Sequence, residues 1–157
     1  MKKKTRRIEV RESFPYPIEL VWRAITDPEA LSRWFMKTDF EPVVGKKFQF
    51  RAEPMRGWRG YVDCEVLEVE EPHRLRFSWQ GMPEHNVTTV TYELEQRGDS
   101  TVIRAVHEGF DRSHGFLSGW MLRGILKGGW KKMFGKLLPQ VLANGREGNI
   151  SAAISGK

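Results

Sequence analysis

Residues Gly129–Leu142 read GWKKMFGKLLPQVL, and the spacing of their apolar side chains decides the fold. These side chains recur at the i, i+3, i+4, i+7, i+8 and i+11 intervals of one helical face. They are Trp130, Met133, Phe134, Leu137, Leu138 and Val141. The spacing predicts a C-terminal helix with a wide apolar face. Pro139 lies inside it and cannot donate to the Gly135 carbonyl, so we expect a kink there.

The middle of the chain, about residues 40–110, has a different period. Apolar side chains alternate with polar ones in KKFQFR, YVDCEV, LRFSW, VTYEL and VIRAVHEG. This alternation predicts half-buried strands, and the Gly and Pro residues between them suit antiparallel hairpins.

The N-terminal part predicts one strand and two short helices. Residues 8–14, IEVRESF, alternate like a strand. Pro17 can begin a helix that buries Ile18, Val21, Trp22 and Ile25, and Asp27-Pro28 can cap a second helix with Leu31, Trp34 and Phe35 on its buried face.

Together these elements predict an α+β domain in which a curved antiparallel sheet wraps around the C-terminal helix. The sheet needs a cover for its apolar face, and that helix has the widest apolar stripe in the sequence. We expect one domain over residues 8–143, a flexible basic segment over 1–7 and a loosely ordered polar tail over 144–157.

Composition narrows the function classes. The 157 residues are 39% hydrophobic and 29% charged, with no apolar run long enough to cross a bilayer. The basic N-terminus lacks a following apolar stretch, so we expect a cytoplasmic protein without a membrane span. The net charge of +6 comes without a nucleic-acid-binding motif, and most basic residues alternate with acids. We therefore expect no nucleic-acid partner.

Five motifs in order make the chain resemble the helix-grip superfamily of START-like, Bet v 1-like proteins (SRPBCC). Within it, the chain resembles the activator of Hsp90 ATPase homologues. The motifs are FPYPIELVWRAITDPEALSRWF, VVGKKFQF, EVEEPHRLRFSW, VHEGF and GGWKKMFGKLLPQVL. The likeness covers about residues 8–143. It implies a helix-grip fold with a cavity between sheet and helix, commonly used for apolar small molecules.

The alternation supplies walls for such a cavity. The strands and the second short helix would contribute Phe35, Phe48, Phe50, Val62, Cys64, Phe77, Trp79, Val90, Tyr92 and Ile103. The C-terminal helix would contribute Trp130, Met133, Phe134, Leu137 and Leu138. Aromatic and Met-containing walls are typical of ligand sites, but an apolar stripe at helical spacing is also what an ordinary core needs. A filled core and a ligand cavity both remain open at this point.

Two polar residues fall on the inward face. Glu12 has the inward parity of the first strand and His107 that of the last strand, and the helix-grip fold makes these strands neighbours. A buried carboxylate or imidazole needs a partner. The two side chains could therefore pair with each other or anchor a polar group of a ligand, or Glu12 could reach water and His107 could be a hydrogen-bonded core residue.

The sequence gives little support for nucleophilic catalysis, metal binding or phosphate binding. The inward Cys64 has the pattern of a small hydrophobic residue and not of a nucleophile. The histidines have no metal-ligand spacing, and no phosphate loop, serine elbow or paired-carboxylate motif occurs. We expect no metal, no cofactor and no catalytic residue.

Three functions follow as hypotheses. The first is a non-enzymatic binder or carrier of an apolar, aromatic or lipid-like molecule. The second, implied by the family resemblance, is a co-chaperone-like module with an Hsp90-type partner. The third is a cyclase- or hydrolase-like enzyme that would use Glu12 and His107 as its acid–base pair.

Overall fold

The computed structural model describes residues 7–54, 58–83, 86–110 and 126–146, with the side chains of 145 and 146 left out. Its first elements are β1 (Ile8–Phe14), α1 (Ile18–Thr26), α2 (Pro28–Trp34) and β2 (Lys37–Thr38). The sheet continues with β3 (Lys47–Arg51), β4 (Tyr61–Glu70), β5 (Arg74–Trp79), β6 (Thr88–Arg97) and β7 (Ser100–Glu108). The C-terminal helix is α-helical over 126–132, then forms the π-helical turn η1 (Met133–Leu137) and α4 (Leu138–Arg146).

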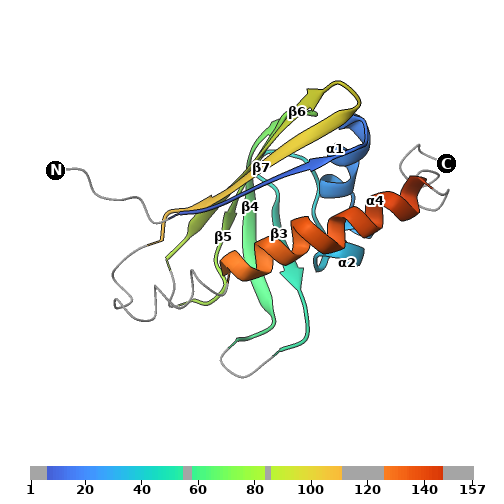
Figure 1. Ribbon diagram of the computed structural model, residues 1–157. Coiled ribbons are helices and arrows are strands. Elements are labelled where there is room, and N and C mark those ends of the chain that lie inside the picture. The colour runs from blue at the N-terminus through green and yellow to red at the C-terminus, as the bar shows by residue number, and fades with distance from the viewer. Residues whose placement is uncertain (1–6, 55–57, 84–85, 111–125, 147–157) are drawn as a thin grey trace.

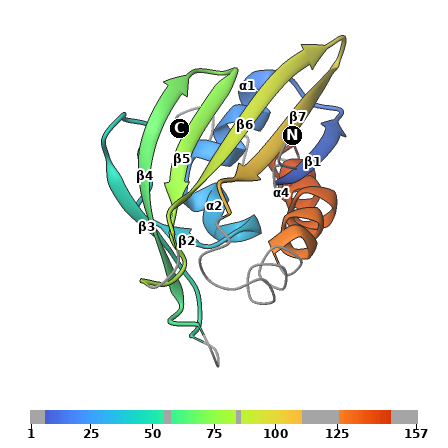
Figure 2. The same cartoon turned by 90° about the vertical axis from the view of Figure 1, so that its left-hand side faces the viewer.

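The seven strands form one antiparallel sheet in the order β1-β7-β6-β5-β4-β3-β2. The first and last long strands are therefore neighbours, because β1 pairs with β7. Figures 1 and 2 show the sheet curling around one side, where α1, α2 and the C-terminal helix lie. The predicted α+β helix-grip architecture is confirmed.

The two short helices begin where the sequence predicts. Pro17 precedes α1, whose buried residues include Val21 and Trp22. Asp27 caps α2 because its Oδ2 accepts from the Ala30 N–H at 3.0 Å, and Pro28 occupies the first turn. The short strand β2 and the buried Phe40 that follows it were not predicted from the pattern.

The C-terminal helix departs from a regular α-helix at η1. Leu138 N–H donates to the Met133 carbonyl, five residues back, directly before Pro139. One additional residue in a turn shifts the following residues by about 100° around the axis. Leu138 and Leu142 thereby come into line with Trp130 and are buried, whereas Leu137 is only partly buried. The predicted stripe is thus confirmed at Trp130, Phe134, Leu138 and Val141. Met133 and Leu137 are only partly buried, and Leu142 is a buried residue that the stripe did not include.

Candidate functional site

The inner face of the sheet supplies one wall of the candidate site. Alternating residues of β3 to β7 point inward, and those predicted to do so are less than a tenth exposed. They are Phe48, Phe50, Val62, Cys64, Phe77, Trp79, Val90, Tyr92, Ile103 and His107. The sheet therefore presents a continuous apolar surface to the C-terminal helix.

The helix meets this surface with an aromatic centre. Trp130 lies 5.8 Å from Phe134 by ring centroids, with the rings 20° from parallel, and 5.7 Å from Trp79. Tyr92 packs edge-on against both Trp130 and Phe134. We call these rings, with their neighbours, the aromatic cluster: Trp34, Phe35, Phe50, Phe77, Trp79, Tyr92, Trp130 and Phe134. Met133, Leu137 and Leu138 from the same helix also pack against the core.

Phe35 is the half-buried member of this cluster. It follows the last residue of α2 and stacks on Trp130 at 5.5 Å and 25°. It also packs edge-on against Phe50 at 4.6 Å and lies 6.0 Å from Trp79. Offset stacking and edge-to-face contacts of this kind contribute about 0.5–1.5 kcal/mol beyond area burial. Phe35 also stacks on Trp34 at 5.5 Å, so this partly exposed ring lies among four other aromatic rings.

His107 is fully paired in the interior. The indole N–H of Trp130 donates to His107 Nδ1 at 3.1 Å, so Nδ1 carries no proton and the proton lies on Nε2. His107 Nε2 then donates to Thr88 Oγ1 at 2.7 Å, and the Thr88 hydroxyl donates to the Trp79 carbonyl at 3.0 Å. This polar chain runs from the C-terminal helix through β7 and β6 to β5.

Burial sets the protonation of the titratable groups inside. It lowers the pKa of His107 to about 3, so the imidazole is neutral near pH 7, as its acceptor role toward Trp130 requires. Burial also raises the pKa of the Cys64 thiol and of the Tyr92 hydroxyl. Cys64 is therefore a poor nucleophile, in keeping with the expectation of a small hydrophobic residue.

Glu12 lies far from His107 along the sheet. Ile8 is opposite His107, whereas Glu12 is opposite Ile103. Four residues of a strand span about 13 Å, so the two side chains do not pair. Glu12 Oε2 instead lies 3.7 Å from the position that a Cβ on Gly135 would occupy. The structure thus gives no support to an acid–base pair of Glu12 and His107.

Several site residues were not predicted as such. Thr88 has the inward parity of Val90 and Tyr92, so extending that alternation by two residues would have found it. Phe110, which packs 4.8 Å from His107, and Trp58 follow breaks in the strand pattern, where parity gives no signal. The sequence around Trp120–Leu126 also predicts a helical segment, but of these residues only Leu126 lies in the described part of the chain, where it is partly buried against the core.

Residues 15–143 match the family model described as activator of Hsp90 ATPase homolog 1-like protein. The chain belongs to this family. No curated protein matches the sequence. The resemblance of the five motifs to the activator of Hsp90 ATPase homologues is confirmed.

Solved structures share the fold of this Hsp90-activator-like chain. MLL2253 from Mesorhizobium loti is 32% identical with a TM-score of 0.75, over 88% of this chain and 97% of that one. BH1534 from Bacillus halodurans is 26% identical with a TM-score of 0.72, over 87% and 96%. An Hsp90 activator from Plasmodium falciparum is 24% identical with a TM-score of 0.70, over 87% and 96%, and shows likeness of fold alone.

Two further observations bear on the class of site in this Hsp90-activator-like domain. Within the described ranges, no group of three or more His, Cys, Asp or Glu side chains is placed to hold a metal ion. No helix of the described part of the chain is long and apolar enough to cross a bilayer.

Proposed function

We propose that the protein binds an aromatic, apolar small molecule between the sheet and the C-terminal helix, with the aromatic cluster as its wall. The observation that carries this proposal is the half-buried Phe35 ring, which is held against Trp130, Phe50 and Trp79 but is not fully enclosed. Phe35 occupies the place that a ligand ring would take.

A ligand ring can displace Phe35 at a low energetic cost. The residue follows the end of α2, so its side chain can move without disturbing a strand or a helix interior. A ligand ring that replaces it regains the stacking on Trp130 and the edge contact with Phe50. The net gain then comes from the additional apolar area that the ligand removes from water.

The two inward polar residues have different places in this proposal. Both His107 ring nitrogens are engaged, so His107 holds Trp130 in position and does not itself offer a free hydrogen-bonding group. Glu12 has no hydrogen-bond partner among the described residues and stays a proposed polar contact near Gly135.

A thermal-shift screen tests the proposal. Polycyclic aromatics, flavonoids and lipid-like compounds are each titrated, and a compound that binds only the folded state raises Tm in a saturable way. Trp130→Phe should reduce the shift because it removes ring area and the bond to His107. Phe35→Leu should increase it, because the leucine competes less well with the ligand ring. Lys132→Ala, at an exposed helix position, is the control and should leave the shift unchanged.

The screen and the variants distinguish a ligand site from a permanently filled core. Opposite effects of the Phe35 and Trp130 substitutions support a ligand that displaces Phe35. The absence of a saturable shift from all compound classes would contradict the proposal and favour a permanently filled core.

A second candidate function is binding to an Hsp90-type chaperone, which the family description favours. The test is whether the purified protein co-purifies with the host Hsp90 and changes its ATPase rate. No effect on either measurement would dismiss this function without affecting the ligand proposal.

A further inference from the structure

The nitrogen edges of two indole rings meet at Gly81, beside the aromatic cluster. A Cβ placed on Gly81 would lie 4.0 Å from Trp58 Nε1 and 4.0 Å from Trp79 Nε1, and no other atom of the described residues comes as close outside its chain neighbours. Gly81 does not have a positive φ, so its backbone does not require glycine. Among the described residues, the missing side chain therefore leaves a position between two hydrogen-bond donors that no other group fills.

Neither indole N–H is used by the described part of the protein. Among those residues, no acceptor is paired with Trp58 Nε1 or Trp79 Nε1, although Trp79 is only 7% exposed. Two other indoles of the core behave differently, because Trp34 donates to the Ala24 carbonyl and Trp130 to His107. Among the described residues, the side-chain nitrogens buried without a hydrogen-bond partner are Arg74 Nε and Arg76 Nε, and neither indole nitrogen is one of them. Both indole N–H groups can therefore be hydrated in the free protein, and an acceptor oxygen of a ligand can take the place of that water.

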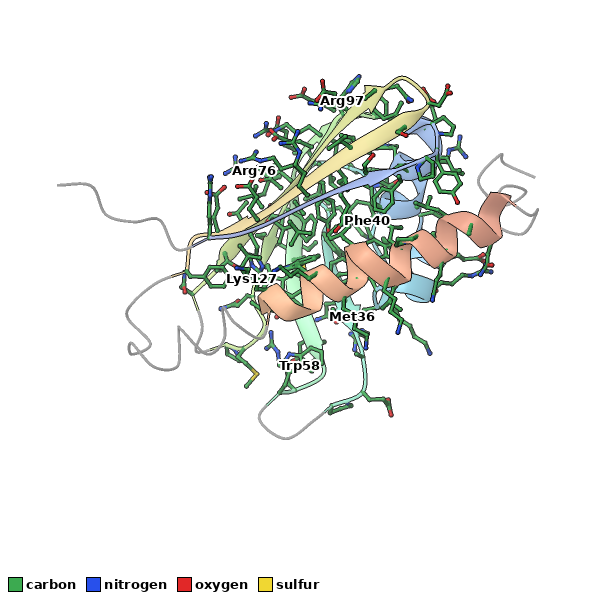
Figure 3. The ribbon with its side chains drawn as sticks, in the orientation of Figure 1. Met36, Phe40, Trp58, Arg76, Arg97 and Lys127 are labelled. Atoms are coloured by element: carbon green, nitrogen blue, oxygen red, sulfur yellow. The ribbon has the colours of Figure 1, made fainter. Side chains whose placement is uncertain are left out.

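The same place is continuous with the proposed ligand wall. The Trp79 ring lies 6.0 Å from both Phe35 and Phe50 and 5.7 Å from Trp130. Trp58 packs as a partly buried residue against the core, and in Figure 3 it lies by the β3–β4 hairpin, below Met36. Because an indole N–H bond lies in the plane of its ring, these donors act at the edge of the wall and not at its face.

We infer that the indole N–H groups of Trp58 and Trp79 recognise an acceptor oxygen at the edge of the bound aromatic molecule, next to Gly81. The inference rests on the proposed function and specifies its ligand class as an aromatic carbonyl compound. A neutral oxygen suits the site better than a carboxylate. Arg59, which donates to the neighbouring Gln80 carbonyl, already forms an ion pair with Asp63 at 3.1 Å.

Two compounds of the same shape test this inference. Fluorenone and fluorene share their ring system, but only fluorenone has a carbonyl oxygen. Isothermal titration calorimetry should show that the protein prefers fluorenone by about three- to tenfold, the effect of one or two neutral hydrogen bonds. Indole ¹⁵N–¹H signals of Trp58 and Trp79 should shift more with fluorenone than with fluorene.

Two variants test whether the preference for fluorenone over fluorene arises at Trp58 and Gly81. Trp58→Phe keeps an aromatic ring without its N–H, so it should lower the affinity for fluorenone and leave that for fluorene within about twofold. Gly81→Ala places a methyl group at the acceptor position, at ordinary contact distance from both nitrogens, and should also remove the preference. Lys132→Ala should keep the wild-type ratio of affinities, because this exposed helix residue lies outside the site.

The results distinguish this inference from the proposed function. Equal affinity for the two compounds, or a preference that both variants retain, would overturn the role of the two indoles while leaving an aromatic site intact. If the wild-type protein bound neither compound although the thermal-shift screen identified another aromatic ligand, the inference would fail and the proposed function would stand.

Discussion

At the scale of single residues, His107 shows how the fold accommodates a base in an apolar interior. Trp130 donates to one ring nitrogen and Thr88 accepts from the other, so the neutral imidazole is satisfied on both sides. A proton on Nδ1 would face the Trp130 N–H, which is a donor only. The geometry and the burial therefore lower the pKa in the same direction.

This lowered pKa predicts a pH-dependent stability. The pKa of His107 falls from 6.5 in the unfolded chain to about 3 in the folded protein. Above pH 6.5 both states are neutral at this residue and its full contribution to stability is present. As the pH falls toward 3, the unfolded chain takes up a proton that the folded protein does not, and stability declines by about 1.4 kcal/mol per pH unit.

Urea unfolding from about pH 7 to about pH 4 measures this decline. His107→Asn should be less stable at neutral pH, because it disturbs the polar chain, but should show a shallower decline as the pH falls. Parallel curves for the two proteins would contradict the pKa assigned to His107.

Thr88 gives a second prediction at this scale. Thr88→Val leaves the Nε2–H of His107 without an acceptor, which should lower the free energy of unfolding by about 1–3 kcal/mol. Thr89→Val is the matched control on the opposite face of β6, where the described residues give the hydroxyl no partner. The control should change stability by less than about 0.5 kcal/mol in the same urea measurement. Equal losses in both variants would show that the Thr88 hydroxyl contributes nothing specific.

Sequence parity predicted which side chains face inward but not which of them interact. The alternation in the last strand correctly placed His107 inside. Its partners come from β6 and the C-terminal helix, and such contacts depend on strand register and helix position. For the same reason the sequence could not show that Glu12 and His107 lie four positions apart along the β1–β7 pair.

At the scale of elements, the C-terminal helix is the element whose structure differs from the pattern in the sequence. Periodicity predicts the helix and its buried face well, because the apolar spacing is long and regular. It cannot predict the π-helical turn, since the pattern assumes about 3.6 residues per turn throughout. Pro139 is the visible signal, because it lacks the N–H that a regular helix would use at that position.

Gly135 lies in this turn and gives the prediction for the helix. Glycine within a helix costs about 0.5–1 kcal/mol relative to alanine. A Cβ there would meet Glu12 Oε2 at 3.7 Å, an ordinary contact distance. Gly135→Ala should therefore raise the free energy of unfolding by about 0.5–1 kcal/mol, measured by urea titration.

Measuring Gly135→Ala in the Glu12→Gln variant separates the effect of helix propensity from the effect of contact with the Glu12 carboxylate. If helix propensity alone is responsible, Gly135→Ala should stabilise the wild-type protein and the Glu12→Gln variant equally. If Gly135→Ala instead destabilises the wild-type protein but not the Glu12→Gln variant, the carboxylate needs the open space beside Gly135.

At the scale of the whole molecule, the two faces of the sheet have opposite character. The inner face carries the aromatic cluster, while charged pairs cross the outer face. Arg104 on β7 contacts Glu9 on β1 at 2.7 Å and Glu93 on β6 at 2.8 Å, and Arg74 on β5 contacts Glu93 at 2.6 Å. Arg104 lowers the pKa of Glu9 through a hydrogen bond. Arg74 also pairs with Glu68 on β4 at 3.2 Å, so the network links five adjacent strands on the side away from the helices.

Arg104→Gln tests the network. The Arg104 side chain is 33% exposed, so we expect a loss of no more than about 1 kcal/mol. The loss should shrink between about 0.1 and 1 M NaCl, as the Debye length falls from about 10 to about 3 Å. Arg97→Gln, which breaks a single and more exposed pair with Glu95, is the control and should cause no measurable loss. A loss that is independent of salt would mean that Arg104 acts through packing and not through its charge.

The overall architecture was the most predictable level. Alternation, turn residues and the amphipathic helix together allow few arrangements, because each apolar face needs a cover. The motif order then specified the family. Neither the half-buried position of Phe35 nor the meeting of Trp58 and Trp79 at Gly81 could be predicted, since both depend on loops whose course the periodicity does not define.

The hydrogen bond from Trp130 to His107 also makes the opening of the C-terminal helix measurable by hydrogen–deuterium exchange. The Trp130 indole proton is held by an acceptor on a different element, and the residue is only 2% exposed. Its exchange with deuterium therefore requires the C-terminal helix to separate from β7, at least briefly. The lifetime of this one proton in heavy water reports how often the helix opens, and so how often a molecule from outside could enter.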